Sequence, residues 1–204
     1  MSRQPAFAGV SRETLERLQC FAGLLRKWNP RINLVSRKTL DDVWARHIID
    51  SMQIQELAPD NIDHWVDLGS GGGFPGLDVA ILALETGSPR RVTLVESDVR
   101  KCAFLRTVLR ETGVKATVLN KRIEELPSLN ANVVSARALA DLPELLGFTA
   151  QHLAKDGVAL FPKGASWQKE VEDAQSQWKF EYQVAKSKTE DGPAILGITG
   201  VSRV

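Results

Sequence analysis

Residues 64–76 read His-Trp-Val-Asp-Leu-Gly-Ser-Gly-Gly-Gly-Phe-Pro-Gly, and this stretch decides the fold. A short, mostly apolar run ends at Leu68 and meets four glycines within five residues, and an apolar helical pattern follows Pro75. This order predicts a strand, a tight glycine-rich turn and a helix. Glycine accepts positive φ and lets a ligand approach the bare backbone, while the start of a helix offers unpaired N–H groups. The turn is therefore a candidate binding site.

An acidic residue stands at the end of the next predicted strand. The apolar run 91–95 leads into Glu96. In open α/β sheets an acid at this place hydrogen-bonds ribose hydroxyls. The turn and Glu96 together indicate a pocket for an adenosine-containing cofactor.

Two classes of cofactor use such a pocket. A dinucleotide fold normally reads Gly-x-Gly-x-x-Gly and rests a pyrophosphate on the helix N-terminus, and the turn 69–74 lacks the third glycine in register. Asp67 suits a ligand with a cationic amino-acid end, which a pyrophosphate does not have. The pattern Val-Asp-Leu-Gly-Ser-Gly is similar to the first motif of S-adenosylmethionine-dependent methyltransferases. A purely structural turn is the alternative.

Length and composition favour one globular domain. The chain has 204 residues, 43% of them hydrophobic and 25% charged, so we expect a single soluble domain with a helical segment at 1–60 and a Rossmann-like core at 61–204. We expect no membrane span and no signal peptide. Cys20 and Cys102 lack metal-ligand spacing and the three histidines are scattered. This favours a reduced cytoplasmic protein without a zinc site.

The net charge of +1 conceals an uneven distribution. Residues 1–50 hold nine Lys and Arg against five Asp and Glu, whereas residues 51–100 hold three against eight. The basic quarter suits a polyanion and the acidic quarter suits a sulfonium cation. Solvated helix faces are the alternative explanation.

Helices and strands are predicted to alternate after an N-terminal helical segment. We expect Ser11 to cap a helix that Asn29-Pro30 ends, and Thr39-Leu-Asp-Asp42 to form a capping box for a second helix. Strands are expected at 64–68, 91–95, 115–119, 131–135, 158–162, 180–184 and 194–204, and helices at 75–85, 98–112, 141–153 and 165–176. Gly113 and Gly157 are expected at helix C-caps or turns. Five parallel strands and a terminal hairpin predict the methyltransferase variant of the doubly wound α/β sheet, with every βα loop at one edge.

Polar residues cluster in three other places. The stretches 27–36 and 46–51 are more polar than a cap requires, although loop chemistry would also explain them. In the stretch 120–125, Ile123 could pack an adenine ring, Glu124 could meet its edge and Arg122 could reach the mouth of the site; solvated charges are the alternative. Arg137 follows the fourth strand, where transfer chemistry sits in this fold, and packing explains it poorly. Lys163, after the fifth strand, is a weaker candidate.

These motifs together resemble a known family. In order they are Lys-Trp-Asn at 27–29, Ile-Asn-Leu-Val-Ser at 32–36, Arg-His-Ile-Ile-Asp-Ser at 46–51, the turn at 66–76, Arg-Lys-Cys-Ala-Phe-Leu-Arg at 100–106, Arg-Ile-Glu-Glu at 122–125, Ser-Ala-Arg-Ala at 135–138 and Phe-Pro-Lys-Gly at 161–164. From about residue 15 to its end the chain resembles the bacterial glucose-inhibited division protein B family, the small-subunit ribosomal RNA guanine-N7 methyltransferases. Ser70 and Gly72 stand where that family more often has threonine and proline. Glu96 stands where aspartate is common.

The resemblance implies transfer of a methyl group to N7 of one guanine in the 530 loop of 16S rRNA. Guanine N7 bears a lone pair and loses no proton, so the reaction needs placement of the base more than a general base. Arginine commonly donates to guanine O6 and N7, but N7 must stay free during attack. A catalytic arginine is therefore expected at O6 or at a phosphate.

The site residues that follow from the pattern and the resemblance fall into three groups. The residues expected to bind S-adenosylmethionine are Asp67, Gly69, Gly71, Phe74, Glu96, Ile123, Glu124 and Arg137. Arg137 and Arg122 are the expected catalytic residues. Lys27, Asn33, Arg46, His47 and Lys163 are the expected RNA contacts, the partner being 16S rRNA in the small ribosomal subunit or an assembly intermediate, bound by a monomer. The alternatives are a small-molecule methyltransferase and a non-catalytic nucleotide-binding regulatory protein.

Overall fold

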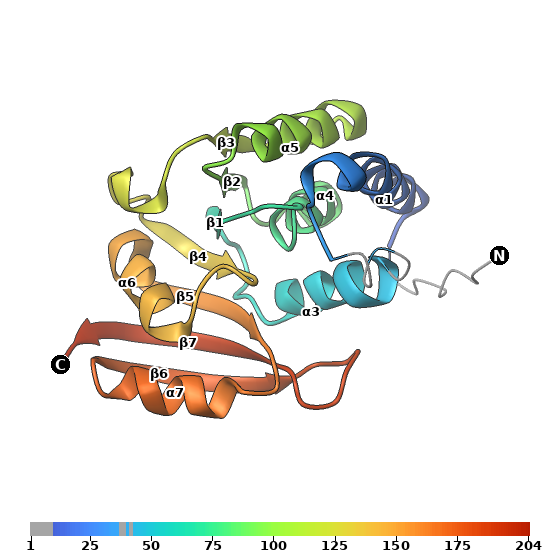
Figure 1. The fold of residues 1–204 in the computed structure, drawn as a ribbon. Coiled ribbons are helices and arrows are strands. Elements are labelled where there is room, and N and C mark those ends of the chain that lie inside the picture. The colour runs from blue at the N-terminus through green and yellow to red at the C-terminus, as the bar shows by residue number, and fades with distance from the viewer. Residues whose placement is uncertain (1–9, 37–39, 41–42) are drawn as a thin grey trace.

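The centre of the fold is a seven-stranded sheet with the order β3-β2-β1-β4-β5-β7-β6 (Figure 1). The computed structural model describes residues 10–36, 40 and 43–204. The strands are β1 (His64–Leu68), β2 (Arg91–Val95), β3 (Thr117–Leu119), β4 (Ala131–Ala136), β5 (Leu153–Lys163), β6 (Trp178–Lys186) and β7 (Ala194–Arg203). β1 to β5 pair in parallel and β7 lies antiparallel between β5 and β6. The predicted parallel sheet with a terminal antiparallel hairpin is confirmed.

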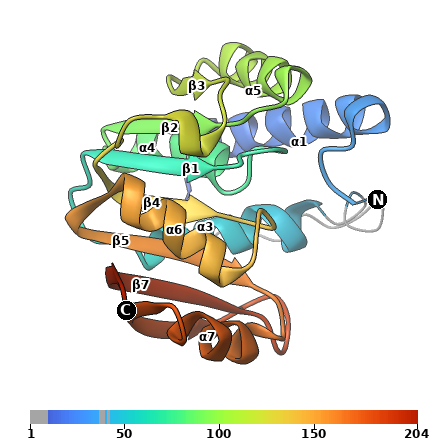
Figure 2. The ribbon, with the colours of Figure 1, turned by 60° about the vertical axis from the view of Figure 1, so that its left-hand side comes forward.

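Helices cover both faces of this sheet. They are α1 (Arg12–Ile32), η1 (Trp44–Ile49), α3 (Asp50–Glu56), α4 (Gly76–Thr86), α5 (Val99–Thr112), η2 (Ile123–Glu125), α6 (Leu142–His152) and α7 (Trp167–Gln175). Side chains of α1, α3, α4 and α5 share one apolar core, and those of α6 and α7 share the other. Figure 2 shows α6 in front of β4 and β5. Successive strand residues point to opposite faces, so Trp65 enters the first core and Val66 the second. None of the described helices is long and apolar enough to cross a membrane.

Helix α1 begins as predicted but ends later. The Ser11 side chain accepts a hydrogen bond from the Thr14 N–H. The predicted end at Asn29-Pro30 is wrong, because Pro30 lies inside the last turn and the helix continues to Ile32. A proline near a helix end removes only one backbone hydrogen bond. The buried Asn29 side chain meanwhile accepts hydrogen bonds from two N–H groups of the following loop, at 2.7 and 2.8 Å, and thereby secures this turn.

The predicted second helix is present as two segments. Most of its proposed capping box lies outside the described residues. From Trp44 to Ile49 the backbone is a π-helix, η1, and it continues directly into α3. Short π-helical segments within α-helices are rare and frequently occur at functional sites.

Of the two glycines expected at helix ends or turns, only Gly113 is there. It caps α5 with φ +69°. Gly157 instead lies inside β5, which starts directly after α6 and is longer than predicted. A Cβ on Gly157 would lie 2.9 Å from the carbonyl oxygens of Ala131 and Asn132. Glycine is therefore needed at this irregular pairing of β4 and β5 because the two backbones approach closely.

Candidate functional site

Three glycines with positive φ build the turn after β1: Gly69 at +65°, Gly71 at +48° and Gly73 at +94°. L-residues with a side chain rarely adopt such angles. A Cβ on Gly69 would also lie 2.6 Å from Cδ1 of Leu139, which belongs to the loop after β4. Bare backbone at Gly69 thus lets two loops of the carboxyl edge of the sheet meet.

Glu96 connects this turn to the neighbouring strand. It follows β2 directly and is buried. One carboxylate oxygen accepts the Gly71 N–H at 2.9 Å, and the other accepts the Asp98 N–H at 2.8 Å. The acid predicted at the strand end therefore lies at the glycine-rich turn and fixes its position.

A cavity of about 460 Å³, cavity A, opens beside Glu96 at the carboxyl ends of β1, β2 and β4. Its walls combine the turn, the loop before η2 and the loop after β4. They are formed by Gly69, Val95, Glu96, Ser97, Lys101, Lys121, Arg122, Ile123, Glu124, Ala138, Leu139, Ala140, Glu144 and Phe148. The walls thus offer carboxylates and basic groups together with apolar side chains.

A second cavity of about 450 Å³, cavity B, lies on the other side of the turn. It is lined by Asn33, Leu34, Val35, Ser36, His47, Gly69, Ser70, Gly71, Gly72, Phe74, Lys101, Arg137 and Ala138. Three residues, Gly69, Lys101 and Ala138, line both cavities. The two cavities therefore adjoin at the glycine-rich turn, and the N-terminal segment supplies one wall of cavity B.

Arg137 lies in cavity B, directly after β4. Its guanidinium carbon is 5.1 Å from the centre of the Phe74 ring, and its Nη2 hydrogen-bonds His47 Nδ1. The His47 ring is itself stacked on Phe74, with 4.8 Å between ring centres. The expectation that packing explains Arg137 poorly is wrong, because an aromatic ring and a histidine hold it.

Three acids, of which Asp67 and Asp78 are buried, act on the pKa of this arginine. Burial lowers the pKa of Arg137, while the charges of Asp50, Asp78 and Asp67 act in the opposite direction. Asp78, on α4, is fully buried, and burial raises the pKa of its carboxyl group well above the usual value. The guanidinium of Arg137 lies at the wall of cavity B, where these acids favour its charged form and burial disfavours it.

Asp67 lies beneath the turn. Its carboxylate accepts the Ser135 hydroxyl at 2.7 Å, and the Trp65 indole donates to the same hydroxyl oxygen at 2.8 Å. A Cβ on Gly76 would lie 2.7 Å from Asp67 Oδ2, so α4 packs directly on this acid. Burial raises the pKa of Asp67 to about 6. Its side chain lines neither cavity, in contrast to the expected contact with the amino-acid end of a cofactor.

The structure does not bring the two predicted catalytic arginines together. Arg122 is exposed at cavity A, whereas Arg137 lines cavity B. Ile123 is buried in the wall of cavity A and Glu124 is exposed at its rim. Ile123 and Glu124 thus line the same cavity as Glu96. This arrangement separates Arg122 from Arg137.

The predicted RNA contacts differ in accessibility. Lys27 and Asn33 are exposed, and Asn33 lines cavity B. Lys163 is instead mostly buried: it pairs with Glu170 at 2.5 Å and donates to the Ala140 carbonyl at 3.2 Å. His47 is only 7% exposed. The free surface needed for phosphate contact is thus missing at Lys163 and His47, and the side chain of Arg46 lies outside the described part of the chain.

Several lining residues were not predicted. Lys101 borders both cavities, Leu139 covers Gly69, and Leu34 to Ser36 form a wall of cavity B. All of them lie within or beside quoted motifs. Their position within or beside a motif is the only sequence signal that could have indicated them, because lysine and leucine are common in helices and loops of any function.

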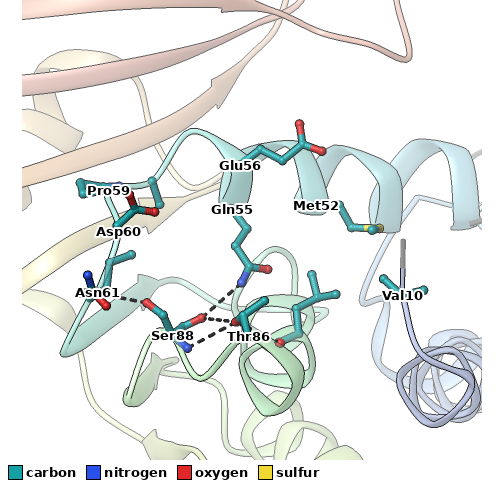
Figure 3. Close-up of a pocket in the computed structure, with 12 residues that line it drawn as sticks. Val10, Met52, Gln55, Glu56, Pro59, Asp60, Asn61, Thr86 and Ser88 are labelled. Carbon is teal, nitrogen blue, oxygen red and sulfur yellow. Dashed lines mark hydrogen bonds between the residues drawn. The ribbon is translucent and has the colours of Figure 1, made fainter. Parts of the chain in front are cut away.

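A further cavity of about 540 Å³ lies at the opposite edge of the sheet, where β1 and β2 begin, between α3 and α4. Figure 3 shows Gln55 and Thr86 directed toward Ser88, whose carbonyl oxygen accepts a hydrogen bond from each. None of the predicted site residues lines this cavity. Across the described part of the chain, no group of three His, Cys, Asp or Glu residues is arranged to hold a metal ion.

The strand order and the site define the Rossmann-like fold of S-adenosylmethionine-dependent methyltransferases. Among solved structures, a putative transferase of Pyrococcus horikoshii has a TM-score of 0.60 at 14% identity, covering 86% of this chain and 67% of that chain. TYW2 of M. jannaschii in complex with AdoMet has a TM-score of 0.55 at 14% identity, covering 84% and 78%. At such identities these likenesses show the fold alone.

The sequence places the chain within one family of this class. The family model for rRNA small subunit methyltransferase G (GidB) matches residues 14–193, and the chain belongs to this family. Ribosomal RNA small subunit methyltransferase G of Ruegeria sp. (strain TM1040) is 59% identical over 96% of this chain and 95% of its own length. The protein of the same name from Paracoccus denitrificans (strain Pd 1222) is 51% identical over 94% and 97%. The resemblance drawn from the motifs is confirmed.

Proposed function

We propose that this chain transfers a methyl group from S-adenosylmethionine to N7 of a guanine in 16S rRNA, in its 530 loop. The observation that carries the proposal is the meeting of cavities A and B at one glycine-rich turn. Cavity A has the features of a nucleoside site, and cavity B has a fixed cation. Membership in the small-subunit methyltransferase G family supports the same reaction.

The residues of cavity A fit an adenosine. Glu96 offers carboxylate oxygens for ribose hydroxyls, as acids at this strand end do in related sheets. Val95, Ile123 and Phe148 offer apolar surface for a ring. The volume of about 460 Å³ is within the usual range of small-molecule sites. Gly69, which borders both cavities, would let the ligand approach the backbone.

When bound, S-adenosylmethionine supplies an electrophilic methyl group on its sulfonium. The protein then has to place guanine N7 in line with that methyl, a contribution of orientation. Since N7 carries a free lone pair, no side chain has to remove a proton from it. The chain's own contribution is to hold the base and to exclude water.

Arg137 is the residue we assign to the base. Its guanidinium is fixed in cavity B over Phe74 and carries a positive charge. We propose that it donates to guanine O6, because donation to N7 would block the attacking lone pair. Single-stranded loops are the usual targets of RNA-specific proteins because their bases can be splayed out, so a loop base could enter this cavity.

We propose further that the substrate is the small ribosomal subunit or an assembly intermediate, and that the chain acts as a cytoplasmic monomer. Cys20 and Cys102 are free thiols, as suits a reducing compartment.

The test is methyl transfer to ribosomal RNA from a strain that lacks the enzyme. Labelled S-adenosylmethionine is incubated with the protein and either 30S subunits or naked 16S rRNA from that strain, and the labelled base is mapped. Subunits from the parent strain, which already carry the mark, are the control. We expect one N7-methylguanine in the 530 loop of the unmodified RNA only. Absence of label, or label on another atom, would reject the proposed function.

A further inference from the structure

One turn of the N-terminal helical segment contacts Arg137. Arginine can only donate hydrogen bonds, so His47 Nδ1 must accept the bond from Arg137 Nη2. The imidazole is therefore neutral, with its proton on Nε2. Its ring also packs on Phe74, which lies under the same guanidinium.

Asp50 follows η1 directly and is the first residue of α3. Burial lowers the pKa of Arg137, and among the charges that raise it that of Asp50 has the largest effect, ahead of Asp78 and Asp67. The Oδ1 atom of Asp50 accepts a hydrogen bond from the Thr189 hydroxyl, which orients this side chain. Thr189 belongs to the loop between β6 and β7.

That loop is attached to α3 at several points. The Gln53 side chain donates to the Lys186 carbonyl at 2.6 Å and accepts the Lys188 N–H at 3.0 Å. Lys188 also forms an ion pair with Glu56. The loop therefore holds α3, and with it Asp50, in place.

The backbone is adapted at the same place. His47 lies within the π-helix η1, whose wider turn joins directly to α3 at Asp50. A π-helical turn changes which residues share a helix face. His47 and Asp50, two of the groups that act on Arg137, lie within this turn and at its junction with α3.

We infer that His47 and Asp50 are positioning residues, which fix the guanidinium of Arg137 over Phe74 in cavity B. This inference rests on the proposed function and assigns the Arg-His-Ile-Ile-Asp-Ser stretch to the transfer site rather than to RNA phosphates. The side chain of His47 is 7% exposed, which suits an internal role. The planar fork of arginine needs partners in fixed directions. His47 Nδ1 supplies one of them, and the charge of Asp50 favours the ionised guanidinium.

The first experiment compares kcat/KM for methyl transfer in three variants. His47→Phe keeps the ring on Phe74 but removes the acceptor, and we expect a loss of at least about tenfold. His47→Asn restores an acceptor near the place of Nδ1, and we expect recovery of most of this loss. His64→Phe is the matched control: His64 is another buried histidine, bonded to Thr93 at 2.9 Å, at the far edge of the sheet. Thermal unfolding of each variant shows whether it is folded.

A double-mutant cycle separates positioning from mere packing. The Arg137→Lys variant has no guanidinium for His47 to hold. Adding His47→Phe to it should therefore lower kcat/KM by less than a further twofold. A further loss as large as in the wild-type background would overturn the inference, as would unchanged turnover of His47→Phe. Wild-type protein that transfers no methyl group would instead reject the proposed function, so the two failures are distinguishable.

A second readout needs neither cofactor nor RNA. In ¹⁵N-labelled protein, the guanidinium signal that disappears in Arg137→Lys should show hindered rotation in the wild type. We expect free rotation in His47→Phe, hindered rotation again in His47→Asn, and partial release in Asp50→Asn. Equal rotation in the wild type and in His47→Phe would overturn the inference.

Discussion

The Gly71 N–H donates a 2.9 Å hydrogen bond to Glu96 Oε2 and thereby ties the turn after β1 to the end of β2. Two requirements on the sequence meet in this contact. Glycine is needed at 71 because φ is +48°, and a long acid is needed at 96 to reach the turn. The same carboxylate borders cavity A. The turn and the ribose-binding acid we propose therefore form one unit.

Gly69→Ala should abolish cofactor binding, and backbone strain at the substituted residue should not account for this loss. A non-glycine residue at positive φ costs roughly 1–2 kcal/mol, and the new Cβ would also meet Leu139 at 2.6 Å. Gly113→Ala is the matched control, because Gly113 has φ +69° and a Cβ added there would have no neighbour within 4 Å. We expect the positive φ to lower the free energy of unfolding by similar amounts in the two variants. Calorimetry should show loss of S-adenosylmethionine binding only in Gly69→Ala. Equal affinity in both variants would place the cofactor elsewhere.

Glu96→Gln should weaken cofactor binding by about 1–3 kcal/mol, the usual cost of disturbing a hydrogen bond to a charged group. The amide also presents an N–H group where Glu96 accepts one from Gly71 or Asp98. The melting temperature therefore has to be measured alongside the affinity. A cofactor analogue without ribose hydroxyls tests the assignment, since it should bind the wild type and the variant with similar affinity. An undiminished difference with this analogue would show that Glu96 does not contact the ribose.

The stability of the protein should depend on pH through Asp67. Burial raises the pKa of this carboxyl group from 3.8 to about 6. Since the folded state binds the proton more tightly, its contribution to stability is fully present below pH 3.8 and is lost as the pH rises through 6. The free energy of unfolding of the wild type relative to Asp67→Asn should fall by about 3 kcal/mol between pH 3.5 and 7. Urea unfolding at several pH values measures it, and a constant difference would contradict the shifted pKa.

Local signals explain why much of this site was predictable from sequence. The positions of Gly69, Gly71 and Glu96 follow from hydrophobic runs and turn residues that are neighbours along the chain. Their meeting follows from parallel strands, whose carboxyl ends share one edge. Ser11 is found as a cap for the same reason, because a cap and its helix are adjacent.

Contacts between distant segments explain the errors. His47 and Arg137 are 90 residues apart, and nothing in either stretch indicates its partner. The place of Lys163 after a strand predicts an RNA contact, but its pairing with Glu170 depends on where α7 packs. Pro30 predicts a helix end, and this prediction is wrong. The Asn29 side chain secures the last turn through hydrogen bonds that are made only in the folded loop, so the sequence does not reveal them.

Lys27→Gln should weaken RNA binding uniformly, because an exposed lysine on α1 would contact phosphate rather than a base. The slope of log affinity against log salt concentration should decrease by about one unit for one lost phosphate contact. Lys179→Gln, an exposed lysine on β6 away from both cavities, is the control. Filter binding with 16S rRNA over a range of salt concentrations measures both. An unchanged slope would remove Lys27 from the RNA interface.

Arg137→Ala should fold and lose about 100-fold or more in kcat, the usual cost of removing one fixed donor from a transfer site. Its guanidinium is held over Phe74 at 5.1 Å in cavity B, where we place the guanine. Arg122→Ala should instead change the affinity for cofactor more than kcat, because Arg122 is exposed at cavity A. Arg91→Ala is the control, since Arg91 pairs with Asp63 where β2 begins, at the far edge of the sheet. Steady-state kinetics on unmodified 30S subunits give kcat and KM for each. Full turnover of Arg137→Ala would show that other residues hold the base, whether or not cofactor binding is unchanged.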